Sequence, residues 1–362
     1  MRASVLIVDD SASARAVLAR MVEDAPGLRL MGTAADPFIA AKRMREETPD
    51  VILLDLEMPR MDGLSFLRKL MAQHPVPVVV CSSLTEAGTP AFLAALEAGA
   101  VDVVAKPRAD SGQALANSGE LIVTALRSAA HARIPGRHKP PPARNYAQIK
   151  VEPRNDASVI LPLGSAPKVR TEQIVCLGAS TGGTEAIREI LMELPADCPP
   201  MAIVQHMPEN FTRAFARRLD SLCAPQVLEA QDGDEMRQGR VLIAPGNRHM
   251  LLLRQARNYI VRVVDGPPVS RHRPSVDVLF RSAVNAAGSN AGAILLTGMG
   301  NDGAQGMLEM HSCGSHTIAQ DEATCIVFGM PHEAIARGAA SAVLPLDKIA
   351  REIVAMKRNS AG

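Results

Sequence analysis

The chain is poor in aromatic side chains. Tryptophan is absent, tyrosine occurs twice and phenylalanine seven times among 362 residues. Hydrophobic residues nevertheless reach 47% of the composition. The core must therefore be built from Val, Ile, Leu, Ala and Met. The length allows two domains of ordinary size and a connector.

Membrane-spanning and leader-like segments are also missing from the sequence. No apolar run approaches the roughly 18 residues that a membrane span needs. Asp9 and Asp10 interrupt the apolar N-terminus, which excludes a signal-peptide pattern. These absences predict a cytoplasmic protein.

Cysteine pairs and excess charge of one sign are lacking too. The six cysteines show no C-x-x-C spacing, so they indicate reduced thiols and not a zinc or disulfide framework. Cys176 is a rival nucleophile, but its place inside an apolar run is typical of a packed core residue. A net charge of +1 argues against nucleic acid as the main partner.

The first part of the chain, residues 1–128, alternates strand-like and helix-like runs. This alternation predicts an α/β fold with a doubly wound, five-stranded parallel sheet. The expected strands are Ser4–Val8, Leu28–Thr33, Val51–Leu54, Val76–Cys81 and Val101–Ala105.

Residues 129–170 interrupt this pattern. Between His131 and Arg170 there are seven prolines, eight basic residues and only two acidic residues. Such a stretch predicts an extended, solvated linker, which we favour over a nucleic-acid-binding arm.

The alternation resumes over residues 171–357 and predicts a second α/β domain with a mainly parallel sheet. Strands are expected at Ile174–Leu177, Met201–Gln205 and Ala293–Thr297, with antiparallel strands near 249–264.

Acidic side chains follow strands of the first domain. Asp9 and Asp10 follow the first strand, Asp55 the third, and Lys106 the fifth. Parallel strands bring all four to one edge, where oxygen-only ligands favour Mg²⁺. An aspartate beside a cation and a lysine is suited to accept a phosphoryl group. Taken singly these acids would be helix caps or turn residues; their convergence favours the site.

Ser180 lies between glycines directly after a predicted strand, in Leu177-Gly-Ala-Ser-Thr-Gly-Gly183. A hydroxyl residue on such a strand-to-helix turn is exposed as a nucleophile, although phosphate loops look similar. His206 ends the next predicted strand, and Asp302 lies in a glycine-rich loop after Ala293–Thr297. The three predict a Ser-His-Asp relay whose chain order differs from that of α/β-hydrolases.

Other polar residues compete for these roles. His206 alone would be a satisfied strand-end histidine, and Asp302 a turn residue. His249, His272 and His332 are weaker candidates. The loop Arg271–Asp277 either receives an acidic substrate surface or caps the helix that follows.

The first 125 positions resemble the receiver domain of two-component response regulators. The resemblance is carried by Val8-Asp-Asp-Ser11, Leu54–Pro59, Met61-Asp-Gly63 and Lys106-Pro107. It implies Mg²⁺-dependent phosphorylation of Asp55 by a histidine kinase, with Ser82 or Ser83 and Lys106 contacting the phosphoryl group. It also implies a cis Lys106–Pro107 bond.

The whole chain resembles the chemotaxis methylesterases, which are protein-glutamate methylesterases and protein-glutamine glutaminases. The matching segments are Gly178–Glu185, Gln205–Pro208, Phe211–Arg213, Ile243–Gly246, Arg271–Phe280, Leu296–Gly303 and Phe328–Pro331. The resemblance implies Ser180 as nucleophile, His206 as general base and acid, and Asp302 as its orienter. It implies the Met299 N–H as oxyanion donor, with Thr181 nearby, and no cofactor for ester hydrolysis.

The partners implied by this resemblance are the cytoplasmic helices of chemoreceptors as substrate and the chemotaxis histidine kinase as phosphodonor. The protein would then be peripheral to the membrane only through its receptors. The alternative is a non-enzymatic response regulator whose C-terminal domain only binds a partner or DNA. A basic recognition helix for DNA is not evident after Arg170.

Overall fold

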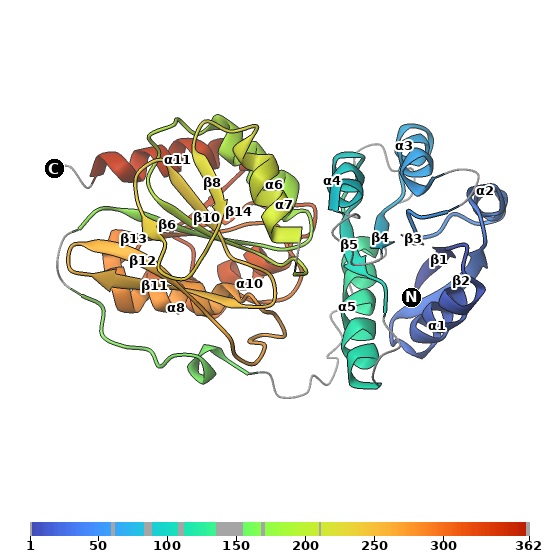
Figure 1. Cartoon of the computed structure of the whole chain (residues 1–362), viewed down its shortest axis with the longest axis horizontal. Coiled ribbons are helices and arrows are strands. Elements are labelled where there is room, and N and C mark those ends of the chain that lie inside the picture. Colours follow the sequence, from blue (N-terminus) through green and yellow to red (C-terminus); the bar gives the residue numbers. More distant parts are fainter. Residues whose placement is uncertain are drawn as a thin grey trace. The chain divides into compact units, whose positions relative to one another are not determined.

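A computed structural model describes residues 2–58, 62–82, 89–107, 112–134, 155–167, 171–209 and 211–359. The chain forms two compact units, residues 1–147 and 148–362, and the division falls inside the predicted linker. Each unit contains a parallel sheet with helices against it (Figure 1).

The N-terminal unit contains the predicted five-stranded parallel sheet, in the order β2-β1-β3-β4-β5. Val, Ile and Leu residues predominate in the three inner strands, β1, β3 and β4, which are buried along their whole length, as parallel sheets require. The strands are β1 (Ala3–Val8), β2 (Leu28–Ala34), β3 (Val51–Leu54), β4 (Val78–Ser82) and β5 (Asp102–Ala105).

Helices alternate with these strands and cover both faces. α1 contacts α5, whereas α3 contacts α4. Side-chain oxygens of Ser11, Asp36 and Asp62 accept backbone N–H bonds and so begin the first three helices. The helices are α1 (Ala12–Asp24), α2 (Pro37–Glu46), α3 (Gly63–Gln73), α4 (Thr89–Glu97) and α5 (Gly112–Ala130).

The C-terminal unit contains a seven-stranded sheet in the order β15-β14-β13-β6-β7-β10-β8, with every neighbouring pair parallel. The central strands are β6 (Ile174–Ala179), β7 (Met201–Gln205) and β13 (Ala291–Leu295). The others are β8 (Gln226–Glu229), β10 (Arg240–Ile243), β14 (Thr317–Gln320) and β15 (Ala342–Leu344).

A separate antiparallel sheet confirms the expectation for residues 249–264. β11 (His249–Gln255) pairs with β12 (Asn258–Val264), which also pairs with β9 (Glu235–Met236). β11 packs against α8 (Val276–Ala287), whose side chains are almost all buried.

Helices lie on both faces of the large sheet (Figure 1). α6 (Gly183–Glu193) contacts α11 (Leu346–Asn359), and α7 (Phe211–Asp220) packs beside β8. α8 contacts α9 (Ala304–Ser312), which contacts α10 (Met330–Ala336). None of the helices in the described ranges combines the length and apolarity that crossing a bilayer needs.

The last part of the predicted linker differs from the expected solvated connector. Ala157 is only 3% exposed and belongs to an apolar cluster with residues of β11 and α8. Asn155 exchanges hydrogen bonds with the loop before α8, and the Gly164 amide donates to Asn285. Residues 155–167 are therefore part of the C-terminal unit, because their apolar side chains pack against residues of β11 and α8.

Candidate active site and phosphorylation site

Ser180 lies on a tight turn between β6 and α6. Its backbone N–H donates to the Thr297 carbonyl at 3.0 Å, and its own carbonyl accepts from the Gly183 N–H at 2.7 Å. Gly182 has a φ of 78°, and a Cβ there would lie 2.6 Å from the Ile326 Cβ. Glycine is thus required where the chain turns behind Ser180.

His206 follows the neighbouring strand and lies beside Ser180. Ala179 pairs with Gln205 across β6 and β7, and the His206 N–H donates to the Ala179 carbonyl at 3.1 Å. The buried Gln205 amide donates to the carbonyl oxygens of both Ser180 and His206, at 3.0 and 3.1 Å. Gln205 therefore ties the two strand ends together, a role that its position at the end of a strand could have indicated.

Asp302 lies in the loop between β13 and α9 and is hydrogen-bonded to His206. Its Oδ2 lies 2.8 Å from His206 Nε2 and also accepts the Val276 N–H at 2.8 Å. Its Oδ1 accepts the Ser275 hydroxyl at 2.7 Å and the Asp277 N–H at 3.1 Å. Burial alone would raise the pKa of Asp302, but His206, His272 and the Val276 N–H hold it at about 2. The carboxylate is therefore ionised beside the imidazole.

The other imidazole nitrogen faces a different situation. His206 Nδ1 is buried and has no hydrogen-bond partner. The structure brings Ser180 next to His206 without a hydrogen bond between Oγ and Nδ1, a looseness common before substrate binds. The ring of His272 stacks on that of His206, with centroids 3.7 Å apart and an angle of 9°. His206 is thus fixed by Asp302 on its edge and His272 on its face.

The two remaining predicted catalytic residues lie against the Ser180 turn. The Thr181 carbonyl accepts the buried Thr297 hydroxyl at 3.0 Å. Met299 follows Gly298, where a Cβ would come within 2.7 Å of the Ser180 Cβ. The chain segment that contains Met299 therefore passes close to Ser180.

A second carboxyl group lies behind Asp302. Asp277 accepts from the Gly306 N–H at 2.8 Å and from the Ser270 hydroxyl at 3.2 Å. Burial, reinforced by the charge of Asp302, raises the pKa of Asp277 to about 8. The two adjacent carboxyl groups thus differ in protonation state at neutral pH: Asp302 is ionised, and Asp277 is mainly protonated.

The weaker candidates lie elsewhere or serve structural roles. His249 is buried and uses both ring nitrogens in hydrogen bonds, while His332 is half exposed and beside Glu333. Cys176 is fully buried in β6, and burial raises its thiol pKa to about 12, so it is no rival nucleophile. The loop Arg271–Asp277 leads to the start of α8, which the Asp302 carboxylate caps from outside the helix.

The N-terminal unit places its acidic side chains at one edge of the sheet, as the sequence predicts. Carboxylate oxygens of Asp9, Asp10 and Asp55 lie within 4.8 Å of one another. Asp9 and Asp55 are buried, whereas Asp10 is exposed. Asp9 Oδ2 is buried and is ion-paired with Lys106. A hard divalent cation fits this set of oxygen donors.

Lys106 supplies the positive charge opposite this cluster. Its Nζ lies 2.6 Å from Asp55 Oδ2 and 3.0 Å from Asp9 Oδ2. Burial alone would lower the pKa of Lys106, but the two carboxylates together raise it, so the ammonium stays charged. Burial raises the pKa of Asp55, and Lys106 opposes that shift.

Ser82 ends β4 next to Ala105, so its buried side chain lies at the same edge as Lys106. Ser83, Pro59 and Met61 lie outside the described residues. The expected cis bond before Pro107 is not found; the cis peptide bond in the described part of the chain is Arg273–Pro274.

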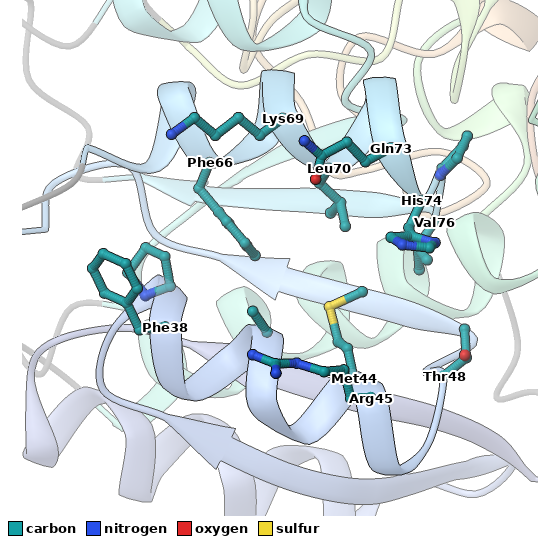
Figure 2. A pocket seen from close by; sticks show the side chains of 13 residues that line it. Phe38, Met44, Arg45, Thr48, Phe66, Lys69, Leu70, Gln73, His74 and Val76 are labelled. Atoms are coloured by element: carbon teal, nitrogen blue, oxygen red, sulfur yellow. The ribbon is translucent and has the colours of Figure 1, made fainter.

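A groove between α2 and α3 was not anticipated from the sequence. It encloses about 660 Å³ and contains none of the acidic-cluster residues. Figure 2 shows Phe38 and Met44 on one wall and Phe66 and Leu70 on the other; the exposed side chains of Arg45 and Lys69 also line the groove. Phe38 is 61% exposed, which makes the groove an apolar surface feature of this unit.

Comparison with known families matches both units. Residues 175–353 match the family model described as CheB methylesterase, and residues 5–115 match that of the response regulator receiver domain.

Relatives match over almost the whole chain. A protein-glutamate methylesterase/protein-glutamine glutaminase of Rhizobium johnstonii is 56% identical over 97% of both chains. One of Rhodospirillum rubrum is 57% identical, again over 97% of both. The crystal structure of the Thermotoga maritima CheB methylesterase catalytic domain is 39% identical, with a TM-score of 0.50, covering 51% of this chain and 99% of that domain.

Proposed function

The chain belongs to the CheB methylesterase family, and we propose that its C-terminal unit hydrolyses γ-glutamyl methyl esters on the cytoplasmic helices of chemoreceptors. Some glutamine side chains of the same helices are deamidated by the same chemistry. The observation that carries this proposal is the buried His206–Asp302 pair, whose second imidazole nitrogen has no hydrogen-bond partner, at a strand end that neighbours the strand end of Ser180.

The first half of the reaction forms an acyl-enzyme. Ser180 Oγ attacks the side-chain carbonyl carbon while His206 Nδ1 accepts the hydroxyl proton. Asp302 accepts the Nε2–H, which keeps Nδ1 unprotonated and stabilises the imidazolium that forms. His206 then returns the proton to the leaving group, so methanol departs from an ester and ammonia from an amide.

The second half releases the product. Water attacks the acyl carbonyl and His206 accepts its proton. The bond to Ser180 Oγ then breaks, His206 returns the proton to that oxygen, and the product acid ionises to a glutamate carboxylate. The Met299 N–H stabilises the oxyanion in both halves, with Thr181 adjacent. These steps use side chains and backbone groups of this chain without a cofactor.

The N-terminal unit is a receiver that controls this hydrolase through phosphorylation. Asp55 accepts the phosphoryl group from a chemotaxis histidine kinase, and Lys106 and Ser82 contact it. Asp9, Asp10 and Asp55 would hold Mg²⁺, which neutralises charge on the transferred group.

A purely binding output domain is disfavoured by the same geometry. Burying an ionised carboxylate against an imidazole costs free energy, and binding a partner at the surface does not require such a pair. Buried pairs of this kind are typical of catalytic sites. Besides its bond to His206, Asp302 accepts three hydrogen bonds, and these hold the carboxylate in the orientation that meets the imidazole.

The test is methanol release from methylated receptor membranes by the full chain. Ser180→Ala is expected to lower kcat by at least about 10⁴-fold, because the nucleophile is lost and only binding and oxyanion contacts remain. Ser221→Ala, an exposed hydroxyl bonded to the Arg218 carbonyl, is the matched control and keeps full activity. Hydrolysis retained by Ser180→Ala would refute the assigned nucleophile.

A further inference from the structure

We infer that Ser275 is a positioning residue for the catalytic carboxylate, and that His249 holds Ser275 in place. This inference rests on the proposed hydrolase mechanism. It assigns to two buried residues outside the Ser180, His206 and Asp302 set the task of fixing how Asp302 meets the imidazole.

Ser275 occupies the residue before α8, where a serine side chain ordinarily caps its own helix. Its hydroxyl makes no such bond. It donates instead to Asp302 Oδ1 at 2.7 Å, and Asp302 accepts the first two N–H groups of the helix, those of Val276 and Asp277. The Asp302 carboxylate therefore caps α8, and the Ser275 hydroxyl donates its hydrogen bond to this carboxylate.

His249 anchors this arrangement from β11. Its ring is fully buried, Nδ1 accepts the Ser275 N–H at 3.3 Å, and Nε2 donates to the Pro267 carbonyl at 3.0 Å. Burial lowers the pKa of His249 and keeps it neutral, the state in which Nδ1 can accept. Both nitrogens are in use, so this histidine positions Ser275 and is not a proton carrier.

The consequence is a carboxylate that cannot turn. Oδ2 contacts His206 Nε2 and the Val276 N–H, and Oδ1 contacts the Ser275 hydroxyl and the Asp277 N–H. Rotation about the carboxylate axis would break bonds on both oxygens. Without the Ser275 hydroxyl, Oδ1 keeps only a backbone donor, and its hold on the orientation of Oδ2 toward His206 weakens.

The experiment compares two buried serines of the same region in the full chain. Ser275→Ala removes the bond to Asp302. Ser282→Ala, the matched control inside α8, removes bonds to the Leu279 carbonyl and the Leu252 N–H but touches no catalytic group. Both serines are at most 1% exposed. We expect Ser275→Ala to lower kcat about tenfold with KM unchanged, the usual size of a lost hydrogen bond to a charged group.

A spectroscopic signature separates positioning from general destabilisation. In ¹⁵N-histidine-labelled protein, the His206 Nε2–H resonance reports its bond to Asp302 directly. Ser275→Ala is expected to shift this proton upfield and speed its solvent exchange, whereas Ser282→Ala leaves both unchanged. His249→Ala should reproduce the effects of Ser275→Ala in weaker form.

Two results would overturn the inference. One is a Ser275→Ala protein with wild-type kcat and an unshifted His206 resonance. The other is an equal loss of kcat in Ser275→Ala and Ser282→Ala, which would make the contact merely structural. If the wild-type chain releases no methanol while the resonance responds as expected, the proposed function fails and the positioning role stands.

Discussion

The two units differ in how they stabilise buried carboxylates, although these carboxylates lie at equivalent places in the two folds. Both sites lie at the carboxyl ends of parallel strands. In the receiver, carboxylate oxygens of three aspartates lie within 4.8 Å of one another, and the Lys106 ammonium contacts two of these aspartates, Asp9 and Asp55. In the hydrolase, Asp302 has four donors on its two oxygens.

The difference indicates that the charge and ligands of the receiver site can change, whereas the surroundings of Asp302 in the hydrolase are fixed. The receiver cluster carries more negative charge than Lys106 balances, which favours the binding of a cation. Under the proposed function, that cation would offset the negative charge of a phosphoryl group on Asp55. Asp302 is a single charge that the protein itself neutralises with N–H and O–H dipoles. Its environment is complete before substrate arrives, which is the condition for electrostatic preorganisation.

The largest expected effect comes from breaking the completed site. Asp302→Asn should lower kcat about 10⁴-fold, because an amide can present its NH₂ to His206 and favour the wrong tautomer. Methanol release at saturating methylated receptor measures this. Asp265→Asn, at an exposed carboxylate paired with Arg248, is the control and should leave kcat unchanged. A loss of less than about tenfold in Asp302→Asn would mean that this carboxylate does not orient the base.

The sequence predicted both convergences because each rests on strand order alone. Asp9, Asp55 and Lys106 follow neighbouring or nearby strands, as do Ser180 and His206, and parallel pairing brings them together. The capping of α8 by Asp302 was not predictable, since it depends on how the loops after β13 and before α8 meet. Nothing in the local pattern around Ser275 distinguishes an ordinary cap from a bond to a residue 27 positions away.

Peripheral elements were harder to predict than central ones. β14 and β15 extend the large sheet beyond β13 but were not anticipated, because they are short and their apolar pattern is weak. The predicted strand Ala293–Thr297 begins two residues earlier, as Ala291–Leu295. The docking of residues 155–167 was also missed, because proline and charge content conceal the few apolar contacts made by Ala157 and its neighbours.

The next effect tests whether the receiver site changes state. Asp55→Asn should abolish the stimulation of methanol release by a small-molecule phosphodonor, because the acceptor oxygen is gone. Basal activity should remain within about twofold. Asp62→Asn is the matched control, since an asparagine at this exposed helix start can still accept the Ser65 N–H. Stimulation that survives in Asp55→Asn would place the phosphorylation elsewhere.

The smallest effect concerns stability near the fixed site and has a definite sign. The pKa of Asp277 is raised to about 8 in the folded chain, from 3.8 without structure, by burial and by the charge of Asp302. A raised carboxyl pKa stabilises the fold fully below about pH 4, and this stability is lost as pH rises toward 8. The pKa of Asp302 is lowered to about 2, so its contribution to the free energy of unfolding changes with pH only below about pH 4.

Asp277→Asn should therefore flatten the pH dependence of unfolding between pH 5 and pH 8. The amide matches the protonated carboxyl in shape and has no charge to desolvate, so the variant gains on the wild type by a few kcal/mol, order of magnitude, across this range. Urea unfolding at several pH values measures the difference. Subtracting the wild type removes the contribution of the histidines, which titrate in the same window. Parallel pH profiles for the two proteins would show that Asp277 is ionised beside Asp302, and that the two carboxyls do not divide their protonation states as the geometry of the site indicates.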